Sequence, residues 1–197
     1  THYMAEALRG MGVTIAEPDE TSFIVTGDGR LREPTAPLFL GNAGTATRFL
    51  AAAAGLVDGL VVIDGDAHMR KRPIGPLVTA LRSLGIDATS ETGCPPVVIR
   101  GKGGFDAGRV EIDGGLSSQY VSALLMLAPG GTGPVDVVLA GDEIGARGYI
   151  ELTLAAMAAF GAQVDQPAPS GWRVAPTGYQ AADIAIEPDA SAATYLW

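Results

Sequence analysis

The chain has few of the residues from which disulfide frameworks and metal sites are built. Its 197 residues include one cysteine, Cys94, and two histidines, His2 and His68. A single cysteine excludes an internal disulfide, and the set does not fit a zinc site made of several cysteines and histidines. We therefore expect a core held by apolar packing, and no metal site built from cysteines and histidines.

Basic residues are also in the minority, and long apolar runs are absent. The chain has 13 Lys and Arg against 22 Asp and Glu, a formal net charge of −9. Binding to nucleic acid requires a basic surface, so we expect no nucleic-acid partner. The longest apolar candidate, residues 49–63, is interrupted by Asp58 and Gly59 and falls short of the ~18 residues of a membrane span. We expect no membrane partner and, because no signal-peptide pattern is present, a cytoplasmic protein.

The ends of the chain have the character of internal sequence. It opens at Thr1 without an initiator methionine and stops within the apolar stretch Thr194–Trp197. We therefore expect a piece of a longer protein. Hydrophobic residues make up 47% and charged residues 18%, which is enough for a packed domain and too apolar for disorder.

Three segments of the chain share one form. In each, apolar residues at helical spacing are followed by a glycine and then a short β-prone run, which predicts a helix that stops at the glycine. The helical parts are residues 3–11, 77–84 and 154–160. The glycines Gly12, Gly85 and Gly161 lie 73 and 76 residues apart.

A second landmark recurs with nearly the same period. Residues 42–47, 116–120 and 189–194 each open an Ala/Leu-rich helix, and Gly44, Ser118 and Ser191 lie 74 and 73 residues apart. Runs of β-prone residues lie between the landmarks, at 22–25, 96–99, 109–112, 171–174 and 183–186. Each unit therefore reads helix, strand, strand, strand, helix, strand over roughly 75 residues.

Units of this size cannot bury both faces alone, so the copies must pack together. We infer an α/β domain over residues 1–197 made of three similar units, with helices inside and sheets outside or the reverse. The alternative is a chance similarity of Ala/Leu-rich helices, which two landmarks with matching spacing disfavour.

Two of the helix starts have the composition of anion sites. Gly41 and Gly44 bracket a start at which Asn42 or Thr45 can cap, and glycine lets a phosphate or carboxylate approach the free N–H groups. Residues 117–119 (Ser-Ser-Gln) add two hydroxyls and an amide at the equivalent start, where one serine would suffice to cap. The alternative is a pair of ordinary caps.

Three cations precede the helix that follows. Arg70, Lys71 and Arg72 stand before Pro73, although cations are unfavourable near a helix N-terminus. This conflict indicates a bound anion, which Arg72 could grip bidentately. The alternative is a solvated basic turn, and we expect Asp66 to pair with Arg70 or Lys71.

The start of the third unit offers two further donors. Arg147 and the hydroxyl of Tyr149 could reach the same region, although Tyr149 could equally be a rim residue of an amphipathic helix. His68 is interpreted as a turn residue. No Ser/His/Asp triad and no Walker-type phosphate loop is present.

These motifs together resemble the EPSP synthase (3-phosphoshikimate 1-carboxyvinyltransferase) family. The signature resembled is residues 38–48, Leu-Phe-Leu-Gly-Asn-Ala-Gly-Thr-Ala-Thr-Arg. Four further motifs follow in the family's order, at residues 72–74, 117–120, 148–150 and 189–191. The resemblance covers the whole chain, which is somewhat under half of a full enzyme.

The resemblance implies a fold and a reaction. The fold has two domains, each of three βαβαββ units around a pseudo-three-fold axis. This chain would be the domain that binds shikimate 3-phosphate, and its Trp197 end would begin the crossover to the second domain. The reaction transfers the enolpyruvyl group of phosphoenolpyruvate to the 5-hydroxyl of shikimate 3-phosphate, in the pathway to aromatic amino acids. The resemblance implies no cofactor and a monomer at full length. The fragment alone would be inactive, with no catalytic acid or base in this chain.

The resemblance also assigns site residues. Those that would bind phosphoenolpyruvate are Asn42, Gly44, Thr45, Arg72 and Gln119. Those that would bind shikimate 3-phosphate are Ser117, Ser118, Gln119, Arg147 and Tyr149.

The chain departs from the family pattern at two positions, and two other functions stay open. Ala146 replaces a serine of the family, and Phe49 replaces the proline that often follows Arg48. One alternative is the enolpyruvyl transferase acting on UDP-N-acetylglucosamine, which uses a cysteine in a mobile loop; Cys94 would have to serve. The other is a non-catalytic anion-binding module of the same fold.

Overall fold

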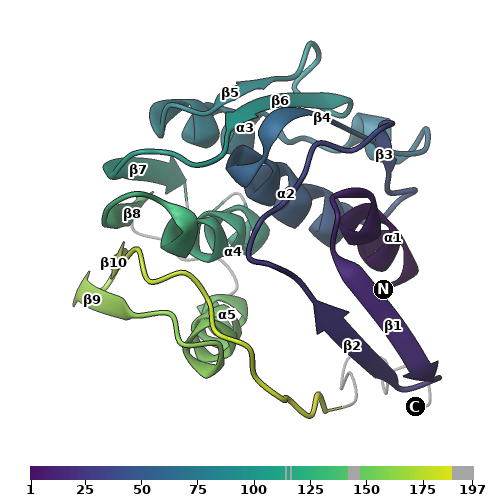
Figure 1. Cartoon of the computed structure of the whole chain (residues 1–197). Helices are drawn as coiled ribbons and strands as arrows, with labels where there is room; N and C mark the ends of the chain where they lie inside the picture. The colour runs from purple at the N-terminus through teal and green to yellow at the C-terminus, as the bar shows by residue number, and fades with distance from the viewer. Residues whose placement is uncertain (114, 116, 142–146, 188–197) are drawn as a thin grey trace, which may run out of the picture.

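A computed structural model of the chain describes residues 1–113, 115, 117–141 and 147–187 (Figure 1). The first unit consists of α1 (His2–Gly10), β1 (Thr14–Asp19), β2 (Ser22–Thr26), β3 (Leu38–Phe39), α2 (Gly44–Ala53) and β4 (Asp58–Asp64). The second consists of α3 (Gly75–Ser83), β5 (Asp87–Thr89), β6 (Val97–Lys102), β7 (Gly108–Asp113), α4 (Ser118–Leu127) and β8 (Val135–Ala140). The third is described as far as α5 (Arg147–Ala159), β9 (Val164–Ala168) and β10 (Gly171–Val174). The predicted order of elements is confirmed in the first two units.

The helix ends are built alike in all three units. Gly12, Gly85 and Gly161 have φ of 88°, 79° and 81°, a left-handed backbone that glycine adopts at little cost. The amide after each glycine donates to the carbonyl five residues earlier: Val13 to Leu8 at 3.0 Å, Ile86 to Leu81 at 3.1 Å and Ala162 to Met157 at 3.0 Å. This is the Schellman motif, and its repetition confirms that the glycines end equivalent helices.

Two four-stranded sheets join neighbouring units. One has the order β3-β4-β6-β5 and the other β7-β8-β10-β9, so each combines two strands of one unit with two of the next. In both, the first pair is parallel and the remaining pairs are antiparallel. The strands β1 and β2 form an antiparallel hairpin of their own. Strands of different units thus hold the domain together.

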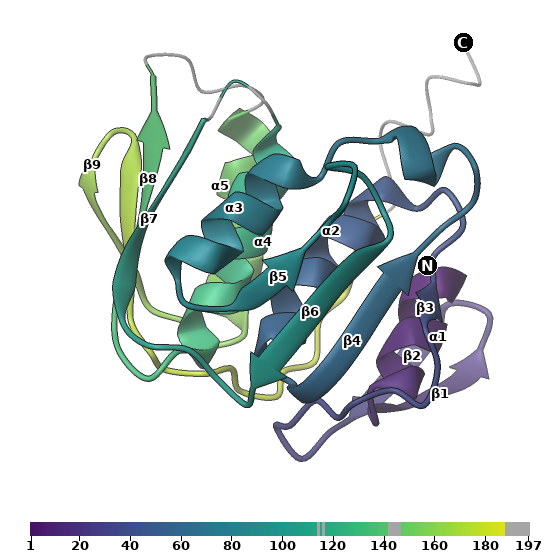
Figure 2. The same cartoon turned by 90° about the horizontal axis from the view of Figure 1, so that it is seen from above.

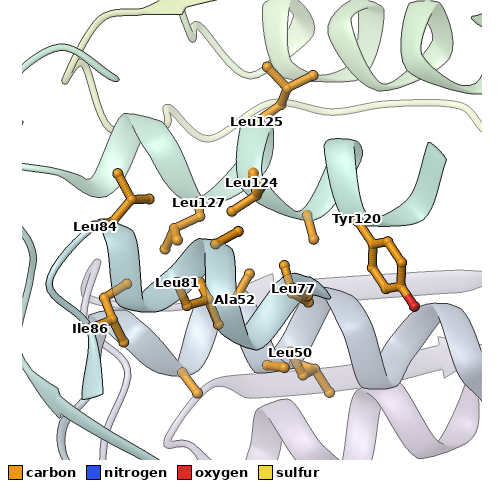
Figure 3. Close-up of a cluster of buried hydrophobic side chains, with 14 of the residues drawn as sticks. Leu50, Ala52, Leu77, Leu81, Leu84, Ile86, Tyr120, Leu124, Leu125 and Leu127 are labelled. Atoms are coloured by element: carbon orange, nitrogen blue, oxygen red, sulfur yellow. The ribbon is translucent and has the colours of Figure 1, made fainter. Parts of the chain in front are cut away.

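Helices α2, α3 and α4 lie inside and the two four-stranded sheets outside, which is the first of the two arrangements left open. Helix α5 buries only Ile150 and Met157. Figure 2 shows α2, α3 and α4 between the two sheets. Helix α4 packs against both α2 and α5, and eight of its ten residues are buried. Leucines of α2, α3 and α4 meet in one cluster, in which Tyr120 lies at one end with its hydroxyl directed away from Leu124 and Leu127 (Figure 3).

The predicted strand at residues 183–186 is not formed. The structure has no helix or strand from residue 175 to 187, and Ile186 is exposed. Its counterpart β7 is hydrogen-bonded to β8, the strand that follows α4. The equivalent partner would follow the helix predicted at residues 189–194, which lies outside the described residues. Among the described residues, no strand pairs with this segment.

Some predicted features fall outside the described residues. Ala146 and residues 188–197 lie outside the described part of the chain, so the third of the predicted helix starts is not observed. Within the described part, none of the helices combines the length and apolar character needed to cross a membrane.

Candidate functional site

The start of α2 leaves backbone donors free. The residue before the helix, Ala43, supplies no side-chain cap, and no oxygen of the described residues accepts from the amides of Thr45 and Ala46. The expectation that Asn42 or Thr45 caps the helix is wrong. Asn42 is exposed, and the Thr45 hydroxyl instead accepts a hydrogen bond of 3.0 Å from Nε2 of Gln119. The helix start therefore keeps two N–H groups for another acceptor.

Two guanidinium groups approach this start from different segments. A Cβ on Gly44 would overlap the guanidinium of Arg72 and would lie 3.5 Å from Nη1 of Arg48. Arg72 reaches the position from the turn before α3, and Arg48 from the second turn of α2 itself. Glycine at residue 44 leaves room for the Arg72 guanidinium, which a side chain at this position would displace.

Arg48 is a site residue that the sequence analysis did not assign. It donates from Nη1 to Oε1 of Gln119 and, at 3.4 Å, from Nη2 to the carbonyl of Pro73. Local sequence carries no signal for it. Arg48 is the fifth residue of α2, beyond the first turn in which the helix dipole acts, and its partners come from distant segments.

Tyr120 is a second such residue. Its ring is buried, and its hydroxyl donates to the carbonyl of Pro73 at 2.6 Å. The Arg48 guanidinium lies over the ring, with Cζ 5.0 Å from the centroid. Together with the Gln119 bonds, these contacts connect α2, the 70–73 turn and α4.

The cations of the 70–73 turn have different partners. Arg70 donates from Nε to Oδ1 of Asp64 at 2.9 Å and also bonds Oδ2 through Nη2, so it holds the pKa of Asp64 below its usual value. The expected pairing of Asp66 with Arg70 or Lys71 is wrong. Oδ1 of Asp66 accepts from the amides of His68 and Met69, both at 2.9 Å, because these amides begin a short 3-10 helix and need a cap.

Arg48 and Arg72, by contrast, make no ion pair with a carboxylate of the described residues. Two like charges that converge on an uncapped helix N-terminus repel each other and reinforce the positive end of the dipole. An anion bound there would relieve both effects. The arrangement can hold a phosphate or carboxylate group without a metal.

The start of α4 lies beside this cluster. The hydroxyl of Ser117 accepts from the amide of Gln119 at 3.3 Å and so caps the helix, while Ser118 is buried at 8% exposure. One turn further, the Ser122 and Thr153 hydroxyls are 2.7 Å apart. The Thr153 proton is used on the carbonyl of Tyr149, at 2.8 Å, so Ser122 is the donor between them.

Arg147 and Tyr149 are not joined to the cluster by any contact among the described residues. Arg147 pairs with Glu151 at 3.5 Å, and the Tyr149 side chain is 62% exposed. The Ser122–Thr153 bond nevertheless places the second turns of α4 and α5 side by side, and Ser118 and Tyr149 each stand one turn earlier. The structure thus brings Gly44, Thr45, Arg72 and Gln119 into contact, with Asn42, Ser117 and Ser118 adjacent in the chain, and leaves Arg147 and Tyr149 on the neighbouring helix.

Two hollows of the surface lie away from the cluster. One of about 530 Å³ is lined by both acids and bases, and another of about 250 Å³ lies between α1 and residues 34–39. Neither touches the cluster, and the described residues hold no group of three or more potential metal ligands. The candidate site is therefore defined by its polar side chains and helix starts, not by either hollow.

Comparison with known proteins gives a consistent result. The model of the family "EPSP synthase (3-phosphoshikimate 1-carboxyvinyltransferase)" matches residues 1–197. A 3-phosphoshikimate 1-carboxyvinyltransferase of Rhizobium leguminosarum bv. trifolii is 71% identical over 197 residues, covering 100% of this chain and 47% of that protein. The chloroplastic protein of that name from Solanum lycopersicum is 41% identical over 99% of this chain and 40% of its own length.

Solved structures agree. The EPSP synthase of Acinetobacter baumannii superposes with a TM-score of 0.75 at 26% identity, over 88% of this chain and 38% of that one. The chain spans about half the length of the curated relatives it matches. The repeated units, the helix starts and the match along the full sequence lead to one conclusion: this chain belongs to the EPSP synthase family.

Proposed function

We propose that this chain is the shikimate 3-phosphate-binding domain of an enzyme that transfers the enolpyruvyl group of phosphoenolpyruvate to the 5-hydroxyl of shikimate 3-phosphate. The observation that carries the proposal is the convergence of Arg48 and Arg72, without carboxylate partners in the described chain, on the uncapped start of α2 at Gly44. Both substrates carry a phosphate and a carboxylate. Such ligands need dense, preorganised donors.

The donors divide between the two substrates. Arg72, Gly44 and the amides of Thr45 and Ala46 would hold phosphoenolpyruvate, with Asn42 beside them. Because Gln119 bonds both Thr45 and Arg48, it lies where a side chain can touch both ligands.

Shikimate 3-phosphate would lie over the starts of α4 and α5. Its donors would be the hydroxyls of Ser117 and Ser118, together with Arg147 and Tyr149 from α5. The Ser122–Thr153 bond supports this grouping, because it holds the two helices together one turn below Ser118 and Tyr149.

The reaction needs groups beyond this chain. The 5-hydroxyl loses its proton as its oxygen adds to C2 of phosphoenolpyruvate, and C3 gains a proton. The tetrahedral intermediate then loses phosphate from C2 and a proton from C3. The groups that move these protons belong to the remainder of the full-length protein. We therefore expect the 197-residue chain alone to be inactive. We also propose that the full-length protein is monomeric and cytoplasmic, with no nucleic-acid or membrane partner.

The UDP-N-acetylglucosamine reaction has less support. Cys94 lies in a loop between β5 and β6 that is tied to the start of α3, because the carbonyl of Gly93 accepts from the amides of Ile74 and Gly75 at 2.8 and 3.0 Å. The thiol is thus held in place rather than carried on a free loop. The relatives named above also bear the name of the shikimate enzyme.

The test uses the full-length protein that contains this chain. Phosphate release from phosphoenolpyruvate is measured with shikimate 3-phosphate, and separately with UDP-N-acetylglucosamine, as acceptor. Turnover with the first acceptor alone is expected. Turnover with the second alone would replace the proposal by the sister reaction. Phosphate binding without turnover of either acceptor would leave a non-catalytic module.

A further inference from the structure

The carbonyl oxygen of Pro73 is bonded from two directions. The Tyr120 hydroxyl donates to it at 2.6 Å from α4, and Nη2 of Arg48 donates at 3.4 Å from α2. Pro73 follows Arg72 directly, and Arg72 carries the guanidinium that lies against Gly44. We propose that Tyr120 is a positioning residue that holds the Arg72–Pro73 peptide, and through it the Arg72 guanidinium, over the start of α2. The inference rests on the proposed function only in taking phosphoenolpyruvate as the anion that binds there.

The backbone at this turn transmits the position of the carbonyl to Arg72. Proline fixes its own φ and has no N–H, so the Pro73 carbonyl is the only backbone group through which residue 73 can be held. The residue before a proline is confined to extended conformations, and Arg72 has φ −89° and ψ 127°. With few free dihedrals between them, fixing the Pro73 oxygen fixes the origin of the Arg72 side chain.

Tyr120 also supports the second cation. Its ring lies under the guanidinium of Arg48, with Cζ 5.0 Å from the centroid. A cation over an aromatic face is attracted by the ring electrons, and here the tyrosine is 2% exposed, so water weakens the attraction little. One buried side chain therefore acts on both guanidinium groups, through its ring on Arg48 and through its hydroxyl on the Arg72 turn.

Burial makes the bond from the hydroxyl consequential. A buried phenol must find an acceptor, and the Pro73 carbonyl is the one it has among the described residues. Tyr120 does not touch the space beside Gly44 by any recorded contact, so its effect on a bound anion is indirect. That distinguishes it from Arg72, whose guanidinium reaches the space itself.

The variant that isolates the hydroxyl is Tyr120→Phe, since it keeps the ring and the packing. The control is Tyr179→Phe. The hydroxyl of Tyr179, a half-exposed residue, donates to the carbonyl of Met126 at 2.9 Å, so this variant also removes one tyrosine bond to a backbone carbonyl. In the full-length protein, Tyr120→Phe should weaken phosphoenolpyruvate binding about three- to tenfold, the range of one hydrogen bond. The affinity for shikimate 3-phosphate and kcat should change less than twofold, and Tyr179→Phe should change neither affinity.

Calorimetry with phosphoenolpyruvate, alone and with shikimate 3-phosphate present, decides between the outcomes. Equal phosphoenolpyruvate affinities for Tyr120→Phe and Tyr179→Phe would overturn the positioning role, as would an equal loss of both substrates in Tyr120→Phe. If the parent binds phosphoenolpyruvate but does not turn over shikimate 3-phosphate, the proposed function fails. The ratio of the phosphoenolpyruvate affinities of the two variants would then still test the role of Tyr120. A parent that does not bind phosphoenolpyruvate at all would overturn both.

Discussion

Gly44→Ala is the most direct test of how the site is built. The added methyl group would occupy the position taken by the Arg72 guanidinium, so the two cannot coexist. The guanidinium is the far end of a long side chain and can swing away into solvent, because Arg72 is exposed. The substitution should therefore displace Arg72 without disturbing the core.

The expected rise in KM follows from the hydrogen bond that Arg72 would lose. A charge-assisted hydrogen bond between Arg72 and an anionic substrate contributes about 1.5–3 kcal/mol, so its loss should raise KM for phosphoenolpyruvate roughly 10- to 100-fold. Stability should change by less than about 0.5 kcal/mol, because alanine favours the helix while nothing rigid is in its way.

The assay is steady-state phosphate release by the full-length protein at saturating shikimate 3-phosphate, with thermal unfolding measured in parallel. Gly75→Ala is the matched control, because Gly75 is likewise the first residue of its helix and a Cβ there meets only ordinary contacts, 3.7 Å from Gly93. A Gly44→Ala enzyme with the parental KM for phosphoenolpyruvate would refute the reasoning. A fall in Tm of many degrees would show instead that the position is structural.

Three further predictions concern single side chains of the full-length protein. Arg72→Ala should lower kcat/KM for phosphoenolpyruvate by a factor that corresponds to a loss of transition-state stabilisation on the order of 2–4 kcal/mol. An unchanged kcat/KM would contradict the assignment. Ser118→Ala should weaken shikimate 3-phosphate binding by about 1–2 kcal/mol in calorimetry, whereas equal affinity would exclude Ser118 from the site. The lowered pKa of Asp64 means that its bond to Arg70 stabilises the fold above the unfolded-state pKa near 4 and is lost as the pH falls. Asp64→Asn should therefore reduce stability in urea unfolding at pH 7 and much less at pH 3; an equal loss at both would refute the linkage.

Local signals in the sequence predicted the elements of the fold well. Each helix-ending glycine was recognisable because a Schellman motif needs a left-handed residue, and Gly12, Gly85 and Gly161 meet that need in three copies. The placement of helices inside and sheets outside was not predictable, because the helices and the strands of these units each have an apolar face that could form the core. It depends on α4 being buried on nearly every side, which only the packed structure shows.

The partners of polar side chains were less predictable. Asp66 and Asp64 both precede Arg70 closely, and sequence spacing alone does not say which reaches it. The end of β4 directs Asp64 to Arg70, while the first amides of the 3-10 helix occupy Asp66. The roles of Arg48 and Tyr120 depend on contacts between segments up to 71 residues apart, which no local pattern reports.

The spacing of those contacts explains why repetition produced a binding site here. Thr45 and Gln119, joined by a 3.0 Å hydrogen bond, are 74 residues apart, which is also the distance between the equivalent helix starts Gly44 and Ser118. A residue that bonds its own counterpart must lie close to the axis relating the two units. The first two units therefore bring their helix N-termini, with the positive ends of their dipoles, to the same point.

Divergence at equivalent positions then distinguishes the two helix starts. Counted from Gly44 and Ser118, the small Ala46 corresponds to Tyr120, and Arg48 corresponds to Ser122. The first start thus keeps bare amides and gains a cation, while the second gains hydroxyls and the tyrosine that supports that cation. Under the proposed function, two copies of one backbone arrangement would in this way hold two different phosphorylated ligands side by side, as a transfer between them requires.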